Sequence, residues 1–191
     1  MPEPNPPRWI WLPLPRGSIA EPVARHWLGA QLALPPDRLP LQRDVHGRPQ
    51  LEGALHHWDC NWSHSGEGLL VALGHGIRVG IDLEWFRPRP RALPLARRFF
   101  TAAEAEALAA MDESEQEHAF QRLWCAKEAV LKAHGHGLAF GLDRLAFIDT
   151  PEGLLLHACD PALGRPGQWV LRELVPAPGY LGAVAVQRAD D

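Results

Sequence analysis

Two carboxylates spaced two residues apart are the first candidates for chemistry. Asp82 and Glu84 lie in the segment Val79-Gly80-Ile81-Asp82-Leu83-Glu84. Successive side chains of a β-strand point to opposite faces, so we expect Asp82 and Glu84 to share one face while Ile81 and Leu83 enter the core. Neighbouring carboxylates repel each other unless a cation neutralises them, and Mg²⁺ prefers oxygen ligands. The alternative is a solvated strand face with two unrelated acids.

A second candidate is the helical pattern Trp124-Cys-Ala-Lys127-Glu128-Ala-Val-Leu-Lys132. Residues four apart share a helix face, so Trp124, Glu128 and Lys132 form one row. Lys127 falls beside the apolar stripe, where its amine must reach a partner or extend to water. We expect Glu128 to be ionised at neutral pH because Lys127 and Lys132 place positive charge nearby. The alternative is a surface Glu128–Lys132 pair with little effect on stability.

A third candidate is the polar segment Asn61-Trp-Ser63-His64-Ser65-Gly66. Hydroxyl, imidazole and backbone N–H groups can all donate to a phosphate, although the same residues also suit an ordinary turn. His57, Cys60 and His64 offer a rival zinc site, with irregular spacing and no obvious fourth ligand. Arg48, which follows Gly47, is either a solvated turn residue or a phosphate ligand.

The elements that would carry these residues indicate an α+β protein. We expect one helix over residues 21–34, stopped by Pro35-Pro36. Thr101/Glu104 and Ser114/Glu117 are capping-box pairs, and the second opens a long helix that ends at about His134, before Gly135. Residues 39–51 are expected to form a loop. Strands are expected at residues 8–14, 69–73, 78–85, 144–148, 153–157, 169–174 and 180–187.

Length and composition narrow the class of protein. The 191 residues fit one compact domain or two small fused halves. A net charge of −4 argues against a nucleic-acid partner. The apolar patch Trp9–Leu14 is short and contains Pro13, so we expect neither a signal peptide nor a membrane partner, and a cytoplasmic location. The three cysteines Cys60, Cys125 and Cys159 do not suggest a disulfide framework.

Taken together, these motifs resemble the Sfp-type 4′-phosphopantetheinyl transferases. That family carries a G-[IV]-D-x-E strand, then a Phe- and Glu-containing segment, then W-x-x-K-E-x-x-x-K. The matches here are Gly80–Glu84, Phe99–Glu104 and Trp124–Lys132. The family's upstream G-K-P turn and N-x-S-H-S segment are matched by Gly47-Arg48-Pro49 and Asn61–Ser65. The resemblance covers residues 46–142 in the family's order.

The resemblance implies two similar α/β halves, 1–76 and 77–191, related by a pseudo-twofold axis, with the active site in the cleft between them. It implies that Asp82, Glu84 and Glu128 hold Mg²⁺ against the pyrophosphate of coenzyme A. The coenzyme A contacts would come from His64, Arg48, Ser63, Lys127 and Arg25. This chain has few basic residues near its N-terminus, where relatives often bind the adenosine 3′-phosphate, and only Arg16 and Arg25 could serve there.

The implied reaction is Mg²⁺-dependent transfer of 4′-phosphopantetheine from coenzyme A to a serine hydroxyl of an acyl or peptidyl carrier protein, with release of adenosine 3′,5′-bisphosphate. Glu128, Lys132 and Glu84 would be the catalytic residues. Glu128 is the first candidate for the general base and Glu84 the second, and we expect a monomer. The alternatives are a Mg²⁺-dependent nucleotide phosphohydrolase and a non-catalytic module that binds coenzyme A or a carrier protein.

Overall fold

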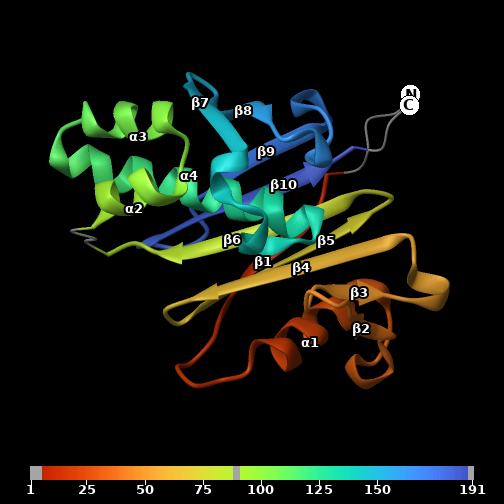
Figure 1. Ribbon diagram of the computed structural model, residues 1–191. Coiled ribbons are helices and arrows are strands. Elements are labelled where there is room, and N and C mark those ends of the chain that lie inside the picture. The colour runs from red at the N-terminus through yellow and green to blue at the C-terminus, as the bar shows by residue number, and fades with distance from the viewer. Residues whose placement is uncertain (1–5, 88–90, 189–191) are drawn as a thin grey trace.

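The computed structural model describes residues 6–87 and 91–188, and within them helices and strands form an α+β fold (Figure 1). Two antiparallel three-stranded sheets have the strand orders β1-β5-β4 and β6-β10-β9, and β2-β3 and β7-β8 form two further hairpins. The elements are β1 Arg8–Pro13, α1 Ala20–Leu32, β2 Leu41–Arg43, β3 Pro49–Leu51, β4 Trp58–Ser65, β5 Gly68–His75, β6 Arg78–Trp85, α2 Ala92–Phe99, α3 Ala102–Ala109, α4 Glu113–His134, β7 Leu145–Thr150, β8 Gly153–Cys159, β9 Trp169–Leu174 and β10 Tyr180–Gln187.

The local predictions agree with this fold except in four places. The expected loop over residues 39–51 contains the hairpin β2–β3, and helix α2 had no sequence signal that we recognised. The polar segment 61–66 lies mostly in strand β4 rather than in a turn. The Thr101/Glu104 capping box forms as predicted. The expected Ser114 cap is wrong, because α4 begins at Glu113 with Asp112 as its N-cap and Ser114 already lies inside the first turn.

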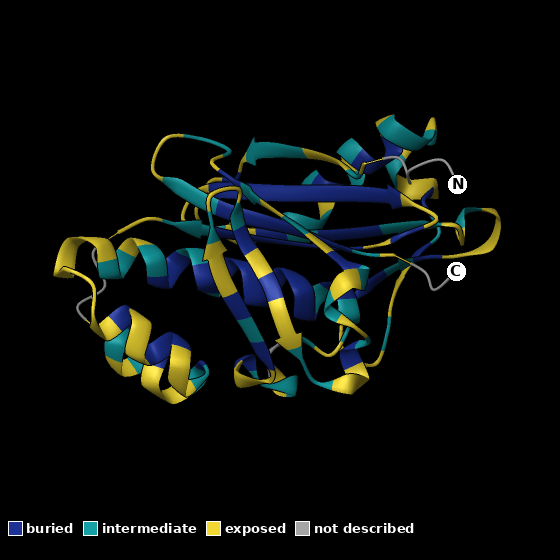
Figure 2. Cartoon of the chain, turned by 90° about the horizontal axis from the view of Figure 1, so that it is seen from above, coloured by how far each residue is buried: buried dark blue, intermediate teal, exposed yellow. Residues whose placement is uncertain are grey.

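Three apolar clusters form the interior, and Figure 2 shows the central strands and much of α4 in the colour of buried residues. Helix α1 packs on one face of β5, through Leu69, Val71 and Leu73. Leu70 and Ala72 on the other face of β5 meet Val79, Ile81 and Leu83 of β6. The even-numbered residues of β6 therefore face α4, so the predicted alternation of Asp82 and Glu84 against Ile81 and Leu83 is confirmed.

Strands β4 and β6 run side by side, but side chains rather than backbone ladder bonds connect them. Every second residue of β4 contributes a polar side chain to this seam. Three of them, Asp59, Asn61 and Ser65, accept hydrogen bonds from the backbone N–H groups of Val79, Ile81 and Trp85, at 2.7, 3.1 and 3.0 Å. The fourth, Ser63, donates from Oγ to Asp82 Oδ1 at 2.9 Å. The seam satisfies the edge of β6 and fixes its position along β4.

Strand β6 and helix α4 touch through their backbones at Gly80. A Cβ atom at Gly80 would lie 2.0 Å from the carbonyl oxygen of Ala129 and 2.3 Å from the nitrogen of Ala133. Neither atom belongs to a flexible side chain, so neither can move aside without shifting the helix. The absence of a side chain at Gly80 therefore sets how closely α4 can approach the strand that carries Asp82.

This contact predicts that Gly80→Ala strongly destabilises the fold, by at least about 3 kcal/mol, because the methyl group overpacks a backbone contact. The matched control is Gly167→Ala, since a Cβ atom there meets nothing within 4 Å and the backbone is not in the left-handed region. Urea denaturation of both variants checks the prediction. Equal midpoints for Gly80→Ala and the wild type would show that α4 does not lie this close to β6.

Candidate active site

The predicted carboxylates and Lys132 line one cavity between the two sheets, with a volume of about 540 Å³. Strand β6 contributes Asp82 and Glu84, and α4 contributes Glu128 and Lys132, four residues apart on one face. The opposite wall comes from the N-terminal part of the chain, namely Ile19, Ala20, Glu21, Arg43, Trp62, Ser63 and His64. The structure therefore brings together residues from five segments, and three of them, in 61–65, 80–84 and 124–132, belong to the motifs singled out in the sequence.

Lys132 is the central cation of this cavity. Its Nζ lies 2.6 Å from Asp82 Oδ1, 2.8 Å from Ser63 Oγ and 3.8 Å from Glu128 Oε2. Asp82 is almost completely buried, and its second oxygen, Oδ2, has no hydrogen-bond partner among the described residues. A buried carboxylate oxygen without a partner is costly, so a ligand for Oδ2 would stabilise the site.

The environment of Glu128 holds its proton more tightly than water does. Burial, followed by the negative charge of Asp82, raises the pKa of Glu128 to about 7, and Lys132 only partly opposes this. The expectation that Glu128 is deprotonated at neutral pH counted the two lysines and a bound Mg²⁺ but not this burial, which leaves part of the Glu128 population protonated before an ion binds. Burial alone would lower the pKa of Lys132, but Asp82 and Glu128 together raise it. Lys132 therefore stays charged.

The donor set suits a hard cation. Four carboxylates line the cavity, those of Glu21, Asp82, Glu84 and Glu128, against the two cations Lys132 and Arg43, and one buried oxygen of Asp82 lacks a partner among the described residues. Carboxylate oxygens are the ligands that Mg²⁺ prefers. As the described side chains stand, no three His, Cys, Asp or Glu residues are grouped closely enough to hold a metal, and Lys132 makes the close contact with Asp82. The chemistry of the donors fits Mg²⁺, with Lys132 as the countercharge in this arrangement.

Two basic side chains lie on the opposite wall of the cavity, and sequence reasoning missed one of them. His64 is exposed there, as expected for a group that meets a ligand. Arg43 was not predicted, since only Arg16 and Arg25 were considered for the adenosine 3′-phosphate. Its guanidinium lies over the ring of Trp62, 5.2 Å from the centroid, and pairs with Glu21 at 2.7 Å. The scarcity of basic residues near the N-terminus could have directed attention to the next two arginines along the chain, Arg38 and Arg43, of which Arg43 lines the cavity.

Comparison with known proteins now decides the family. A family model described as the 4′-phosphopantetheinyl transferase superfamily matches residues 78–175, just over half of the chain. The chain belongs to this superfamily. It is 34% identical over 171 residues to 4′-phosphopantetheinyl transferase HetI of Nostoc sp., covering 86% of this chain and 67% of that protein. It is 31% identical over 128 residues to 4′-phosphopantetheinyl transferase Sfp of Bacillus subtilis, covering 67% and 55%.

A further relative is the L-aminoadipate-semialdehyde dehydrogenase-phosphopantetheinyl transferase of Mus musculus, which is 34% identical over 184 residues. That match covers 88% of this chain and 60% of the mouse protein. The chain thus spans between about half and two thirds of the length of the curated relatives it matches. Within the described residues, no helix has the length and apolar character needed to cross a membrane.

Two residues expected to contact coenzyme A lie in the scaffold instead: Arg48, from the Gly-Arg-Pro turn, and Arg25, one of the two basic residues considered near the N-terminus. Arg48 does not line the cavity of Asp82, and its guanidinium is bonded to Asp59 and to backbone carbonyls. Arg25 pairs with Glu21 at 3.1 Å and donates to the carbonyls of Pro36, Leu39 and Leu41. Protein groups engage both side chains, so these two assignments are corrected.

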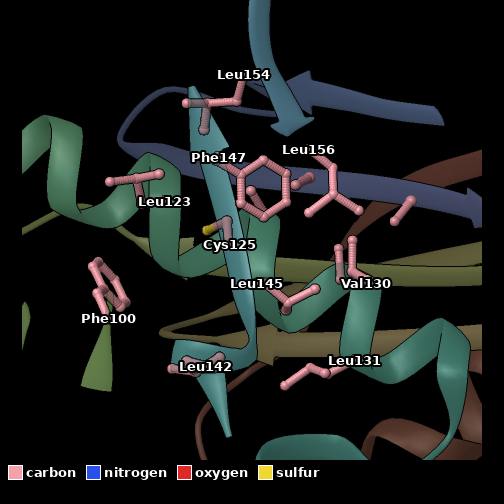
Figure 3. Close-up of a cluster of buried hydrophobic side chains, with 14 of the residues drawn as sticks. Phe100, Leu123, Cys125, Val130, Leu131, Leu142, Leu145, Phe147, Leu154 and Leu156 are labelled. Atoms are coloured by element: carbon pink, nitrogen blue, oxygen red, sulfur yellow. The ribbon is translucent and has the colours of Figure 1, made fainter. Parts of the chain in front are cut away.

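Lys127 is a third correction. Its side chain is completely buried and lies 2.8 Å from Glu104, and it donates to the carbonyls of Leu142 and Leu145. The amine is surrounded by the apolar cluster of the C-terminal part of the chain, whose members Phe100, Leu142, Leu145 and Phe147 appear in Figure 3. Of the two outcomes expected for Lys127, a partner or an extension of the side chain to water, the structure shows the first, and the partner is Glu104.

The rival zinc site is also wrong. Cys60 and His64 lie four residues apart on strand β4, a Cα separation of roughly 13 Å, which is too long for ligands of one ion. Cys60 is buried, and burial raises its pKa to about 12, so the thiol does not become a thiolate at neutral pH. The described residues contain no group of three metal-binding side chains near it.

The raised pKa of Glu128 predicts how stability depends on pH. Because the folded pKa of about 7 exceeds the ordinary value of 4.5, the native state keeps a proton that the unfolded chain releases between these values. The contribution of Glu128 to stability is complete below about pH 4.5 and is lost as pH rises through about 7. Glu128→Gln cannot ionise. The melting temperature of this variant minus that of the wild type should therefore be higher at about pH 8 than at about pH 5.

Thermal melts in a metal chelator measure this difference. The control is Glu113→Gln, at the exposed start of the same helix, which should show no such change between the two pH values. If the melting temperatures of Glu128→Gln and the wild type differ by the same amount at both pH values, the pKa of Glu128 is not raised.

Proposed function

We propose that the protein is a Mg²⁺-dependent 4′-phosphopantetheinyl transferase that moves 4′-phosphopantetheine from coenzyme A to a serine hydroxyl of an acyl or peptidyl carrier protein. Adenosine 3′,5′-bisphosphate is the other product. The observation that carries the proposal is the cavity that joins Asp82, Glu84, Glu128 and Lys132 with His64 and Arg43 on the opposite wall. Membership of the superfamily supports the same activity.

In this proposal, Asp82, Glu84 and Glu128 hold Mg²⁺, which supplies Lewis acidity and neutralises pyrophosphate charge. Lys132, already held by Asp82 and Ser63, stabilises the charge that develops on the leaving phosphate. Glu128 is the first candidate to accept the proton of the carrier serine, and Glu84 is the second.

Recognition of coenzyme A then falls to the opposite wall of the cavity. His64 and Arg43 offer N–H donors to its phosphates. Arg43 takes the role that the sequence had suggested for Arg16 or Arg25, because it lines the cavity and they do not. The planar guanidinium of Arg43 can donate two parallel hydrogen bonds to a phosphate, and its contacts with Glu21 and Trp62 orient it.

We also propose that segments 1–76 and 77–191 are two halves related by a pseudo-twofold axis. The similarity of their parts supports this, since each has a three-stranded antiparallel sheet, a two-stranded hairpin and a helix that covers the sheet. The protein would act as a monomer in the cytoplasm. Cys60, Cys125 and Cys159 are unpaired, which is compatible with a reducing compartment.

The test is incubation with coenzyme A, Mg²⁺ and an apo-carrier protein, read by intact mass. Addition of one phosphopantetheine to the carrier is expected. We expect Asp82→Ala to slow transfer at least about 100-fold because Mg²⁺ would lose a ligand and Lys132 would lose its carboxylate partner. Asp37→Ala, an exposed aspartate outside the cavity, is the control. Release of phosphate without modification of the carrier would favour a phosphohydrolase, and binding without reaction would favour a non-catalytic module.

The opposite wall makes a separate kinetic prediction. A phosphate contact that is equally strong in the ground and transition states lowers KM without changing kcat. His64→Ala and Arg43→Ala should therefore each raise KM for coenzyme A about tenfold while kcat stays within a few-fold of the wild type. Arg38→Ala, an exposed arginine outside the cavity, is the control for lost positive charge. A fall in kcat with unchanged KM would assign these two residues to the chemical step.

A further inference from the structure

The guanidinium of Arg48 has a partner for each of its N–H groups. Nε donates to the carbonyl of Lys132 at 2.9 Å. Nη1 donates to Asp59 Oδ1 at 2.8 Å and to the carbonyl of Pro49 at 3.2 Å. Nη2 donates to Asp59 Oδ2 at 2.6 Å and to the carbonyl of Val79 at 3.0 Å. An arginine has five N–H donors, so none remains for a phosphate.

Asp59 completes this arrangement from strand β4. Its Oδ2 also accepts the N–H of Val79 at 2.7 Å, so Arg48 and Asp59 together bind both backbone groups of that residue. The arginine side chain is only 5% exposed and the aspartate side chain 18%. A bidentate pair this well buried has a defined geometry, and a lysine in place of Arg48 cannot reproduce it.

The contact with Lys132 lies at the C-terminal end of α4. The last four carbonyls of a helix lack partners within the helix. Here the carbonyl of Leu131 accepts from Gly135 N at 2.9 Å, and that of His134 accepts from Arg78 Nη1 at 2.9 Å. The carbonyl of Lys132 is taken by Arg48. The backbone of Lys132 is thus tied to β4 and β6, while its amine is bound to Asp82 and Ser63.

Arg48 also opens onto a different cavity from that of the carboxylates. It lines a cleft of about 720 Å³ together with Asp59, Arg78 and Gln187, and no residue of this cleft also lines the cavity of Asp82. The side chain therefore reaches the candidate active site through backbone groups, the carbonyls of Lys132 on α4 and of Val79 on β6, and not by lining it.

We propose that Arg48 and Asp59 form a positioning pair that holds the last turn of α4 in place and so aims the amine of Lys132 at Asp82. This inference rests on the proposed transferase function for its kinetic consequence. Arg48 acts through Lys132 and does not touch coenzyme A. The arginine in this Gly-Arg-Pro turn thus has a role that a lysine cannot fill, because the role requires five directed donors.

The test compares Arg48→Lys, Asp59→Asn and the double variant Arg48→Met/Asp59→Asn. The double variant leaves no buried charge without a partner, so it guards against simple unfolding. In carrier modification, kcat should fall about 10- to 100-fold in all three, while KM for coenzyme A changes by less than about threefold. Arg78→Ala, which loses only the contact with the His134 carbonyl, is the control and should keep kcat close to that of the wild type.

Hydrogen–deuterium exchange provides a readout that does not depend on activity. In the three variants, amides in the last turn of α4 should exchange faster, whereas those of β10 should not change. If the wild type transfers nothing, the proposed function fails, but the exchange pattern still decides the positioning role. Unchanged exchange in the last turn would overturn it. So would full kcat in all three variants with a raised KM for coenzyme A in the double variant, because that pattern identifies Arg48 as a phosphate ligand.

Discussion

The seam between β4 and β6 is the contact on which the rest of the structure depends. Backbone groups at a buried strand edge must find partners, and here the side chains of alternate β4 residues supply them. Because the donors and acceptors repeat every two residues, sliding one strand by a single residue would break all of these bonds. The position of Asp82 opposite Ser63, and so one side of the candidate active site, follows from this register.

The other side of the site follows from the close approach of α4. With no side chain at Gly80, the helix lies directly against β6, and Lys132 reaches Asp82 across a short gap. Asp82 and Glu128 then lie beside Lys132, and Glu84 lines the same partly buried cavity. Burial, and after it the negative charge of Asp82, raises the pKa of Glu128, and the same buried negative charge is what a divalent cation would stabilise. The proposed metal site and the proposed proton acceptor therefore have one physical origin.

Features set by local spacing were predictable from the sequence. The alternation of Asp82 with Ile81 and the Glu128–Lys132 row follow from strand and helix periodicity. The environments of Arg48 and Lys127 depend on distant partners, such as the Lys132 carbonyl 84 residues from Arg48 and the Leu145 carbonyl 18 residues from Lys127. No local pattern specifies such contacts. The polar stripe of β4 was visible as an alternation at Asn61, Ser63 and Ser65, but it was taken for a phosphate-binding segment or a turn.

The burial of Lys127 has a consequence for how family motifs are used. In W-x-x-K-E-x-x-x-K, one lysine supports the core through Glu104 and the other lies in the candidate active site. In G-I-D-x-E, likewise, Gly80 allows the close packing of α4, whereas Asp82 lines the candidate active site. A paralogue that had lost its chemistry would still need Gly80, Glu104 and Lys127 in order to fold. Selection would therefore preserve much of the signature in inactive descendants, and divergence at the positions of Asp82, Glu128 and Lys132 would be the first sign of lost function.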